Sequence, residues 1–152
     1  MFFLIANVFN VITMRKIRLA KFEDVDVVHN LLDCKPFKYN ETEVPYDRSW
    51  IESLIQNERC LTIVYEIKGK IVGFISGEQL VGNFMMLWFC SVQKEYQNGF
   101  VGYRLYEEFE KRSKERGNDG ILVYAYKTSE KMLARGGYNT NGMMYKEMYK
   151  EL

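Results

Sequence analysis

One segment of this chain constrains its fold more than any other, because it places a helix directly between two strands. Residues 84–92 are apolar almost throughout, as is typical of a central strand buried on both faces. An amphipathic helix follows over residues 102–116, and residues 121–126 predict the next strand. The apolar side of the helix carries Val101, Leu105 and Phe109 at i, i+4 and i+8. This order predicts two parallel strands joined by a right-handed crossover.

The turn between the first strand and the helix reads Gln97-Asn98-Gly99-Phe100-Val101-Gly102. A turn rich in small residues at this place aims consecutive backbone N–H groups at one point, where the helix dipole also favours an anion. The turn therefore predicts a phosphate-binding site. The alternative is that its glycines serve only to form the turn, which is their more common use.

The rest of the chain also alternates between strand and helix patterns. Strands are expected at 17–20, 61–67, 71–76 and 143–149, and helices within 21–32, 49–55 and 129–135. The strands at 61–67 and 71–76 form a hairpin around Lys68-Gly69-Lys70. A polar loop over residues 33–46 is long enough to be functional.

Composition narrows the class of protein. No Pro-, Ser- or Gly-rich break divides the 152 residues, which fit one domain. The formal net charge of +1 argues against an electrostatic nucleic-acid binder. Cys34, Cys60 and Cys90 are odd in number and widely spaced, so they predict neither a disulfide framework nor a metal site and favour a reducing cytoplasm. His29, the only histidine, has no sequence neighbour that would make it a ligand or a base, and we expect it at the surface.

Residues 1–13 are largely apolar, but they lack the basic start and the cleavage site of a signal peptide. They are also too short to span a bilayer, so no membrane association is expected. Two interpretations stay open. The segment is an upstream extension before a natural start at Met14, or it is an extra N-terminal strand or oligomer contact.

Three short phrases carry a resemblance to a known family. Ile71-Val72-Gly73-Phe74-Ile75, Val92-Gln93-Lys94-Glu95-Tyr96 and Arg135-Gly136-Gly137-Tyr138 occur in an order that, together with the turn, resembles the GCN5-related N-acetyltransferase (GNAT) superfamily. The pattern of that family's turn is Q/R-x-x-G-x-G/A. Gln97 and Gly102 match this pattern, whereas Phe100 stands where the first glycine belongs and Gly99 lies one residue early.

The resemblance implies a single-domain α/β (α+β) fold over residues 14–152. Its mixed, twisted central sheet would have about six to seven strands, flanked by about four helices, with strands four and five splayed apart. It also implies acetyl-CoA as co-substrate. The pantetheine arm would pair with the backbone of Cys90 and Val92, and the diphosphate would meet Gln97, Asn98, Gly99, Phe100, Val101 and Gly102.

Acetyl transfer to an amine requires a group that removes a proton from the amine and often a Tyr that protonates the departing thiolate. The resemblance places that Tyr at Leu133 and a frequent Asn at Tyr126, so neither side chain is the usual one. The strand at 84–92 also lacks an acidic residue. We therefore expect Glu78 to act as the base through water and Tyr126 to act as the acid, with packing or a wall of the acceptor cleft as the alternative role of Tyr126. Ser91 and Cys90 have no basic partner in the sequence, which disfavours a hydrolase.

Two functions from different classes stay open. The first is an acetyl-CoA-dependent N-acetyltransferase whose acceptor is a primary amine of a small molecule or a protein, bound between the 33–46 loop and the splayed strands. The second is a catalytically degenerate protein of the same fold that serves in a virion or a partner complex. The second is suggested by Phe100, by Leu133 and by the aromatic residues Phe37, Tyr39, Tyr46 and Trp50.

The abundance of Tyr and Met and the last eight residues resemble acetyltransferase-like proteins encoded by bacteriophages. This resemblance would place the protein in the cytoplasm of a host cell. Both a monomer and a homodimer are compatible with the sequence.

Overall fold

The computed structural model describes residues 14–32, 37–39, 42–125 and 129–140 of the chain. Within these residues a five-stranded sheet has the order β1-β4-β5-β6-β7. Its strands are β1 (Arg15–Leu19), β4 (Cys60–Ile67), β5 (Lys70–Gln79), β6 (Phe84–Val92) and β7 (Gly120–Val123). Neighbouring strands are antiparallel except for β6 and β7, which are parallel. The sheet is therefore mixed, as expected.

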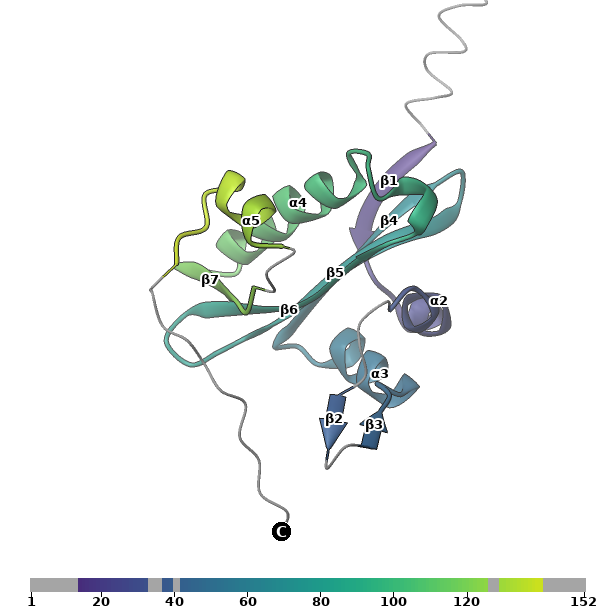
Figure 1. Cartoon of the computed structure of the whole chain (residues 1–152), viewed down its shortest axis with the longest axis horizontal. Coiled ribbons are helices and arrows are strands. Elements are labelled where there is room, and N and C mark those ends of the chain that lie inside the picture. Colours follow the sequence, from purple (N-terminus) through teal and green to yellow (C-terminus); the bar gives the residue numbers. More distant parts are fainter. Residues whose placement is uncertain (1–13, 33–36, 40–41, 126–128, 141–152) are drawn as a thin grey trace, which may run out of the picture.

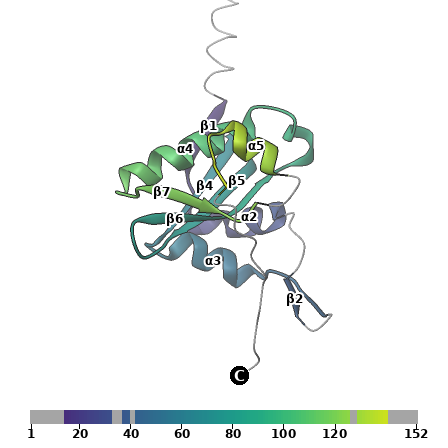
Figure 2. The ribbon, with the colours of Figure 1, turned by 60° about the vertical axis from the view of Figure 1, so that its left-hand side comes forward.

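Helices cover both faces of this sheet (Figure 1). One face carries α2 (Val25–Leu31) and α3 (Arg48–Gln56), and the other carries α4 (Val101–Glu115) and α5 (Glu130–Arg135). Figure 2 shows the same two helical layers after a turn of 60°. Short 3₁₀ turns, Phe22–Asp24 and Lys94–Tyr96, precede α2 and α4.

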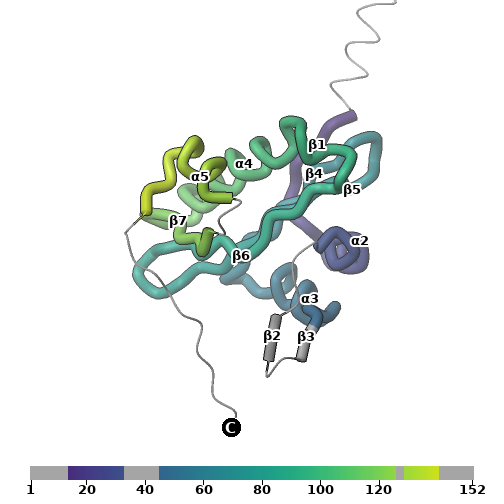
Figure 3. The backbone as a smooth tube through the Cα atoms, in the orientation of Figure 1, coloured from purple at the N-terminus to yellow at the C-terminus, as the bar shows by residue number. Residues whose placement is uncertain are grey.

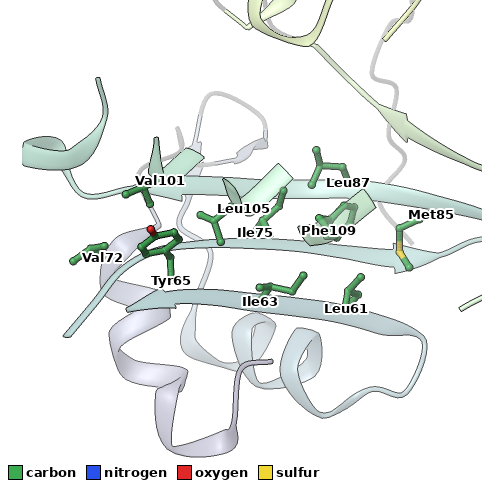
Figure 4. Packing of buried hydrophobic residues seen from close by; sticks show 10 residues of the cluster. All are labelled: Leu61, Ile63, Tyr65, Val72, Ile75, Met85, Leu87, Val101, Leu105 and Phe109. Atoms are coloured by element: carbon green, nitrogen blue, oxygen red, sulfur yellow. The ribbon is translucent and has the colours of Figure 1, made fainter. Parts of the chain in front are cut away.

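The alternation of strand side chains divides the core into two clusters, because successive residues point to opposite faces of a sheet. Ile63 and Ile75 lie in the cluster under α4, whereas their neighbours Val64 and Phe74 lie in the cluster with α2 and α3. Figure 4 shows the cluster under α4, where Leu105 and Phe109 point onto the strands. Both helical layers are thus fixed to one sheet by apolar packing.

A partly buried ionic cluster fixes the chain where it leaves β1. Arg18 contacts both oxygens of Asp24 at 2.6 and 3.0 Å, and its Nε donates to Glu66 of β4 at 2.8 Å. The Lys21 N–H also donates to Asp24 at 2.7 Å. Burial raises the pKa of Asp24, but the hydrogen bonds from Arg18 and Lys21 outweigh it and lower the pKa overall.

Several boundaries differ from those expected. The strand at 84–92 and the hairpin are confirmed, and α4 begins and ends one residue earlier than predicted. Among the described residues the sheet has five strands, fewer than the six to seven expected, and β7 ends at Val123 instead of residue 126. The expected strand at 143–149 and residues 1–13 lie outside the described residues.

The predicted loop at 33–46 contains a two-stranded ribbon. Its strands are β2 (Phe37–Tyr39) and β3 (Thr42–Val44), which pair antiparallel with each other and not with the main sheet. Aromatic and β-branched residues favour such pairing. The surrounding residues are polar, and the sequence therefore predicted a loop here instead of two short strands.

Candidate active site

The two parallel strands part after a short stretch of pairing. β6 pairs with β7 from Phe84 and Gly120 as far as Leu87 and Val123, where β7 ends. β6 continues to Val92, and its last four residues still pair with β5 on the other side. In the part of the chain that the structure describes, no strand lies along Trp88–Val92 on the β7 side. The backbone groups that face this gap are available to an extended ligand.

A β-bulge marks the point where the strands part. Ser76 of β5 pairs with Phe89 and Gly77 pairs with Leu87, so that Trp88 has no partner on β5. Gly77 makes this arrangement possible, because a Cβ there would lie 2.4 Å from the Met86 carbonyl oxygen and 2.6 Å from the ring of Phe109. The side chain of Trp88 is exposed. The predicted buried strand is therefore buried over Met85–Leu87 and opens from Trp88 onward.

From the open end of β6 the chain turns directly into α4, which runs back over the sheet (Figure 3). The first backbone bond of α4 runs from the Arg104 N–H to the Phe100 carbonyl, at 2.9 Å. The preceding N–H groups of Val101, Gly102 and Tyr103 have no acceptor inside the helix, and the N-cap residue Phe100 offers no side-chain acceptor. These donors and the helix dipole favour an anion at this end of α4.

Residues 97–100 adopt a regular turn. The side-chain amide of Gln97 donates to the Val92 carbonyl at 2.9 Å and so fixes the turn to the end of β6. The Gly99 N–H donates to the Tyr96 carbonyl at 3.2 Å. Asn98 lies between them in the same turn. The residues expected to meet a diphosphate thus share one turn at the end of the gap.

Phe100 does not obstruct this turn. Its φ of −81° and ψ of −5° suit any L-residue, and its side chain is 75 % exposed. Gly99 and Gly102 also have negative φ, and a Cβ at Gly102 would come no closer than 3.9 Å to Val92. The fold therefore tolerates Phe in place of glycine at position 100, and it does not itself require glycine at position 102.

An aromatic cluster lies on the face of the sheet that carries α2 and α3. The ring of Tyr46 contacts Trp50 and Phe89 edge-on, with centroids 4.9 and 5.2 Å apart. His29 is half-buried, and its Nε2 lies 2.9 Å from the Tyr46 carbonyl oxygen, so the expected surface histidine has a structural partner. Phe89 was not singled out in the sequence, although its place on β6, one residue after Trp88, puts it beside the gap. The cluster forms an aromatic wall beside the open segment of β6.

The nucleophilic side chains of β6 have other roles. Ser91 donates a hydrogen bond to the Leu31 carbonyl at the end of α2. Burial raises the pKa of the Cys90 thiol to about 12, and a hydrogen bond with the Tyr106 hydroxyl lowers it only in part. Because the thiolate is the reactive form, a thiol with this pKa is a poor nucleophile. Tyr106 was not singled out in the sequence either, since its position on α4 predicts only packing.

Of the two residues expected to be catalytic, Glu78 and Tyr126, the structure describes only Glu78. Glu78 is half-buried and pairs with Met86 of β6. Met86 lies two residues before Trp88 at the bulge, a distance of about 7 Å along the strand. By the alternation of β5 its side chain belongs to the face of the aromatic wall. Tyr126 lies outside the described residues. Leu133 is buried on α5.

Residues 25–138 match the acetyltransferase (GNAT) family. The chain belongs to the GNAT family. No curated protein has significant sequence similarity to it.

Solved structures agree with the GNAT fold. An aminoglycoside acetyltransferase from an uncultured soil metagenomic sample, in complex with sisomicin, has a TM-score of 0.68 at 18% identity and covers 93% of this chain and 99% of its own. A ribosomal-protein-alanine N-acetyltransferase from Brucella melitensis biovar Abortus has a TM-score of 0.66 at 16% identity, with 90% and 99% covered. AAC(6')-Iy in complex with a CoA bisubstrate analogue has a TM-score of 0.71 at 12% identity, with 90% and 98% covered.

Two further properties complete the description of this GNAT fold. In the described ranges no group of three or more His, Cys, Asp or Glu side chains could hold a metal ion. None of the helices in that part of the chain is both long and apolar enough to cross a membrane.

Proposed function

We propose that the protein is an acetyl-CoA-dependent N-acetyltransferase that transfers the acetyl group directly to a primary amine in a ternary complex. One observation carries this proposal: along Trp88–Val92 no described strand pairs with β6 on the β7 side, and the turn over residues 93–100 joins the end of this segment to the uncapped N-terminus of α4. A ligand with amide groups along one part and a diphosphate at the other fits this arrangement.

The residues present fit acetyl-CoA. The pantetheine amides would pair, as a strand would, with the backbone of Cys90 and with the N–H of Val92, whose carbonyl oxygen accepts from the Gln97 side chain. The diphosphate would accept hydrogen bonds from the first-turn N–H groups of α4, and the open space at Gly102 lets it approach the backbone closely. Both contacts use main-chain atoms, which Phe100 leaves unchanged.

The reaction then needs one base and one acid. The amine nitrogen forms a bond to the acetyl carbonyl carbon as the bond from that carbon to sulfur breaks. Glu78 takes the amine proton through water, and Tyr126 gives a proton to the departing sulfur, so that CoA leaves as the thiol. General acid and base groups of this kind contribute about 10²- to 10⁴-fold to a rate.

The acceptor is an amine of a small molecule or a protein. The similar structures include an aminoglycoside acetyltransferase and a ribosomal-protein-alanine acetyltransferase, which represent both classes. The aromatic wall of Tyr46, Trp50 and Phe89 lies beside the gap, where the acceptor would meet the thioester. We assign the acceptor to this side of the sheet.

Calorimetric titration with acetyl-CoA and, separately, with desulfo-CoA tests the proposal without any knowledge of the acceptor. We expect the wild type to bind both and Gly102→Glu to bind neither, because a carboxylate at the N-terminus of α4 repels the diphosphate. Acetyl-CoA at a hundred times its Kd should also stabilise the fold by about 2.7 kcal/mol. A folded wild type that binds neither ligand would overturn the proposal.

A second function is favoured by the burial of Leu133, which occupies the position where the resemblance places the acid Tyr. In that case the protein keeps the fold and acts as a binding or structural component. Incubation with acetyl-CoA and a library of amines separates the two functions. Release of free CoA with any amine supports the transferase, and binding of acetyl-CoA without transfer to any amine supports the second function.

A further inference from the structure

Phe100 has a position that the fold does not explain. Its side chain is 75 % exposed, more than any other aromatic side chain among the large exposed residues of the described chain. None of the ring or cation contacts found in that part of the chain involves it. It also occupies the N-cap of α4, where Ser, Thr, Asp or Asn would satisfy a helix N–H. Phe100 therefore neither caps the helix nor packs against the protein.

The position of Phe100 matters because of what adjoins it. On the proposed function, the diphosphate of CoA lies at the N–H groups of Val101 and Gly102, which directly follow Phe100 at the N-terminus of α4. In CoA the adenosine is bonded directly to the diphosphate. A diphosphate at these N–H groups therefore brings the base within the reach of the side chain at the N-cap.

We propose that Phe100 is the platform on which the adenine ring of acetyl-CoA stacks. This inference rests on the proposed function, since it assumes that CoA binds at the turn. An aromatic ring stacks on a nucleobase without hydrogen bonds, so an exposed Phe with no polar atom suffices. Phe100 adds a side-chain contact for the nucleotide end of the ligand to a site otherwise made of backbone groups.

Tyr103 provides a matched control on the same helix. It lies three residues further, on the same side of α4, and is 60 % exposed. Its hydroxyl is engaged, because a hydrogen bond to Glu107 raises the pKa of Tyr103. Glu107 lies one turn further along α4, away from residues 97–100, and we assign the Tyr103 ring no contact with the base.

Calorimetric titration of wild type, Phe100→Ala, Phe100→Trp and Tyr103→Ala with three ligands tests this inference. The ligands are CoA, dephospho-CoA, which lacks only the 3′-phosphate, and 4′-phosphopantetheine, which lacks the adenosine, its 3′-phosphate and one phosphate of the diphosphate. For Phe100→Ala we expect the Kd of CoA and of dephospho-CoA to rise about 5- to 20-fold, the lower part of the range for base stacking, and the Kd of 4′-phosphopantetheine to stay unchanged. Phe100→Trp and Tyr103→Ala should bind all three ligands as the wild type does.

Three results would overturn the assignment. One is an unchanged or lower Kd of CoA in Phe100→Ala, a second is an equal loss for 4′-phosphopantetheine, and a third is an equal loss in Tyr103→Ala. If the wild type binds CoA in any of these cases, the proposed function still holds and only the role of Phe100 is overturned. A folded wild type that binds no CoA overturns both the proposed function and the role of Phe100.

Discussion

At the scale of the residue, Asp24 is the one buried carboxylate among the described residues. Its side chain is 7 % exposed and accepts hydrogen bonds from Arg18 and from the Lys21 backbone. Breaking a buried pair of this kind leaves a charge without its partner, which costs more than the pair itself contributes.

We expect Asp24→Asn to lower the free energy of unfolding at pH 7 by about 2 to 4 kcal/mol. Because the pKa of Asp24 is lowered in the folded state, its contribution is fully present above the unfolded pKa of about 4 and is lost as the pH falls through the folded pKa. Urea unfolding of wild type and variant should therefore show a gap that narrows from pH 7 to pH 2.5. Asp26→Asn is the control, since Asp26 pairs with Arg48 at 2.6 Å but is 71 % exposed, and it should cost less than about 1 kcal/mol. A gap that stays constant with pH would contradict this account.

Glu78 offers a test of the proposed chemistry at the same scale. Once transfer to an amine has been observed, Glu78→Gln should lower kcat by about 10²-fold or more, because the amide cannot accept a proton. The Kd of acetyl-CoA should stay unchanged, since Glu78 lies along β5 and not at the turn. Glu115→Gln, on the exposed side of α4, should change neither quantity. An equal kcat in Glu78→Gln and wild type removes Glu78 from the mechanism.

At the scale of the element, β6 combines a buried half with an open half, and the bulge at Trp88 separates them. The bulge depends on the close approach of Gly77 to the Met86 carbonyl and to Phe109. Backbone and an aromatic ring of the core cannot both move aside without disturbing the packing under α4.

Gly77→Ala should therefore destabilise the protein by about 1 to 3 kcal/mol, in the range for overpacked cores. Gly102→Ala is the matched control, because its Cβ meets open space and alanine favours a helix over glycine by about 0.5 to 1 kcal/mol. Urea unfolding of both variants measures the difference. Equal stabilities would show that the strands accommodate a methyl group at the bulge.

At the scale of the whole molecule, the regular helices and strands could be predicted from the sequence, whereas the irregular features of the fold could not. The apolar run at 84–92 and the periodicity of Val101, Leu105 and Phe109 gave correct elements, because hydrophobic burial repeats along the chain. The bulge at Trp88 depends on the register between two strands, and no periodic signal encodes it. The ionic cluster joins Arg18 and Asp24 to Glu66, which is 48 positions from Arg18, and single-sequence patterns do not reveal such a distant contact.

The candidate site likewise has some features that the sequence predicts and others that only the folded chain reveals. Residues 97–102 could be identified from the sequence, since a turn between strand and helix has a recognisable composition. The hydrogen bond from the Gln97 amide to the Val92 carbonyl could not be predicted from the sequence, and neither could the exposure of Phe100. Both depend on the local geometry of the folded turn. The aromatic wall joins Tyr46 and Trp50 to Phe89 across two elements, so only the folded chain brings these rings together.

The groups proposed to hold the ligand along the open segment of β6 and at the first turn of α4 are mainly backbone groups, and every residue type except proline carries the same ones. Side chains along this surface can therefore change through mutation while the N–H and C=O groups stay in place. On the proposed function, selection can then alter the aromatic wall to accept a new amine while the backbone groups proposed for acetyl-CoA stay in place. A molecule built in this way would diverge in acceptor faster than in cofactor, and solved structures share its fold at identities below 20%.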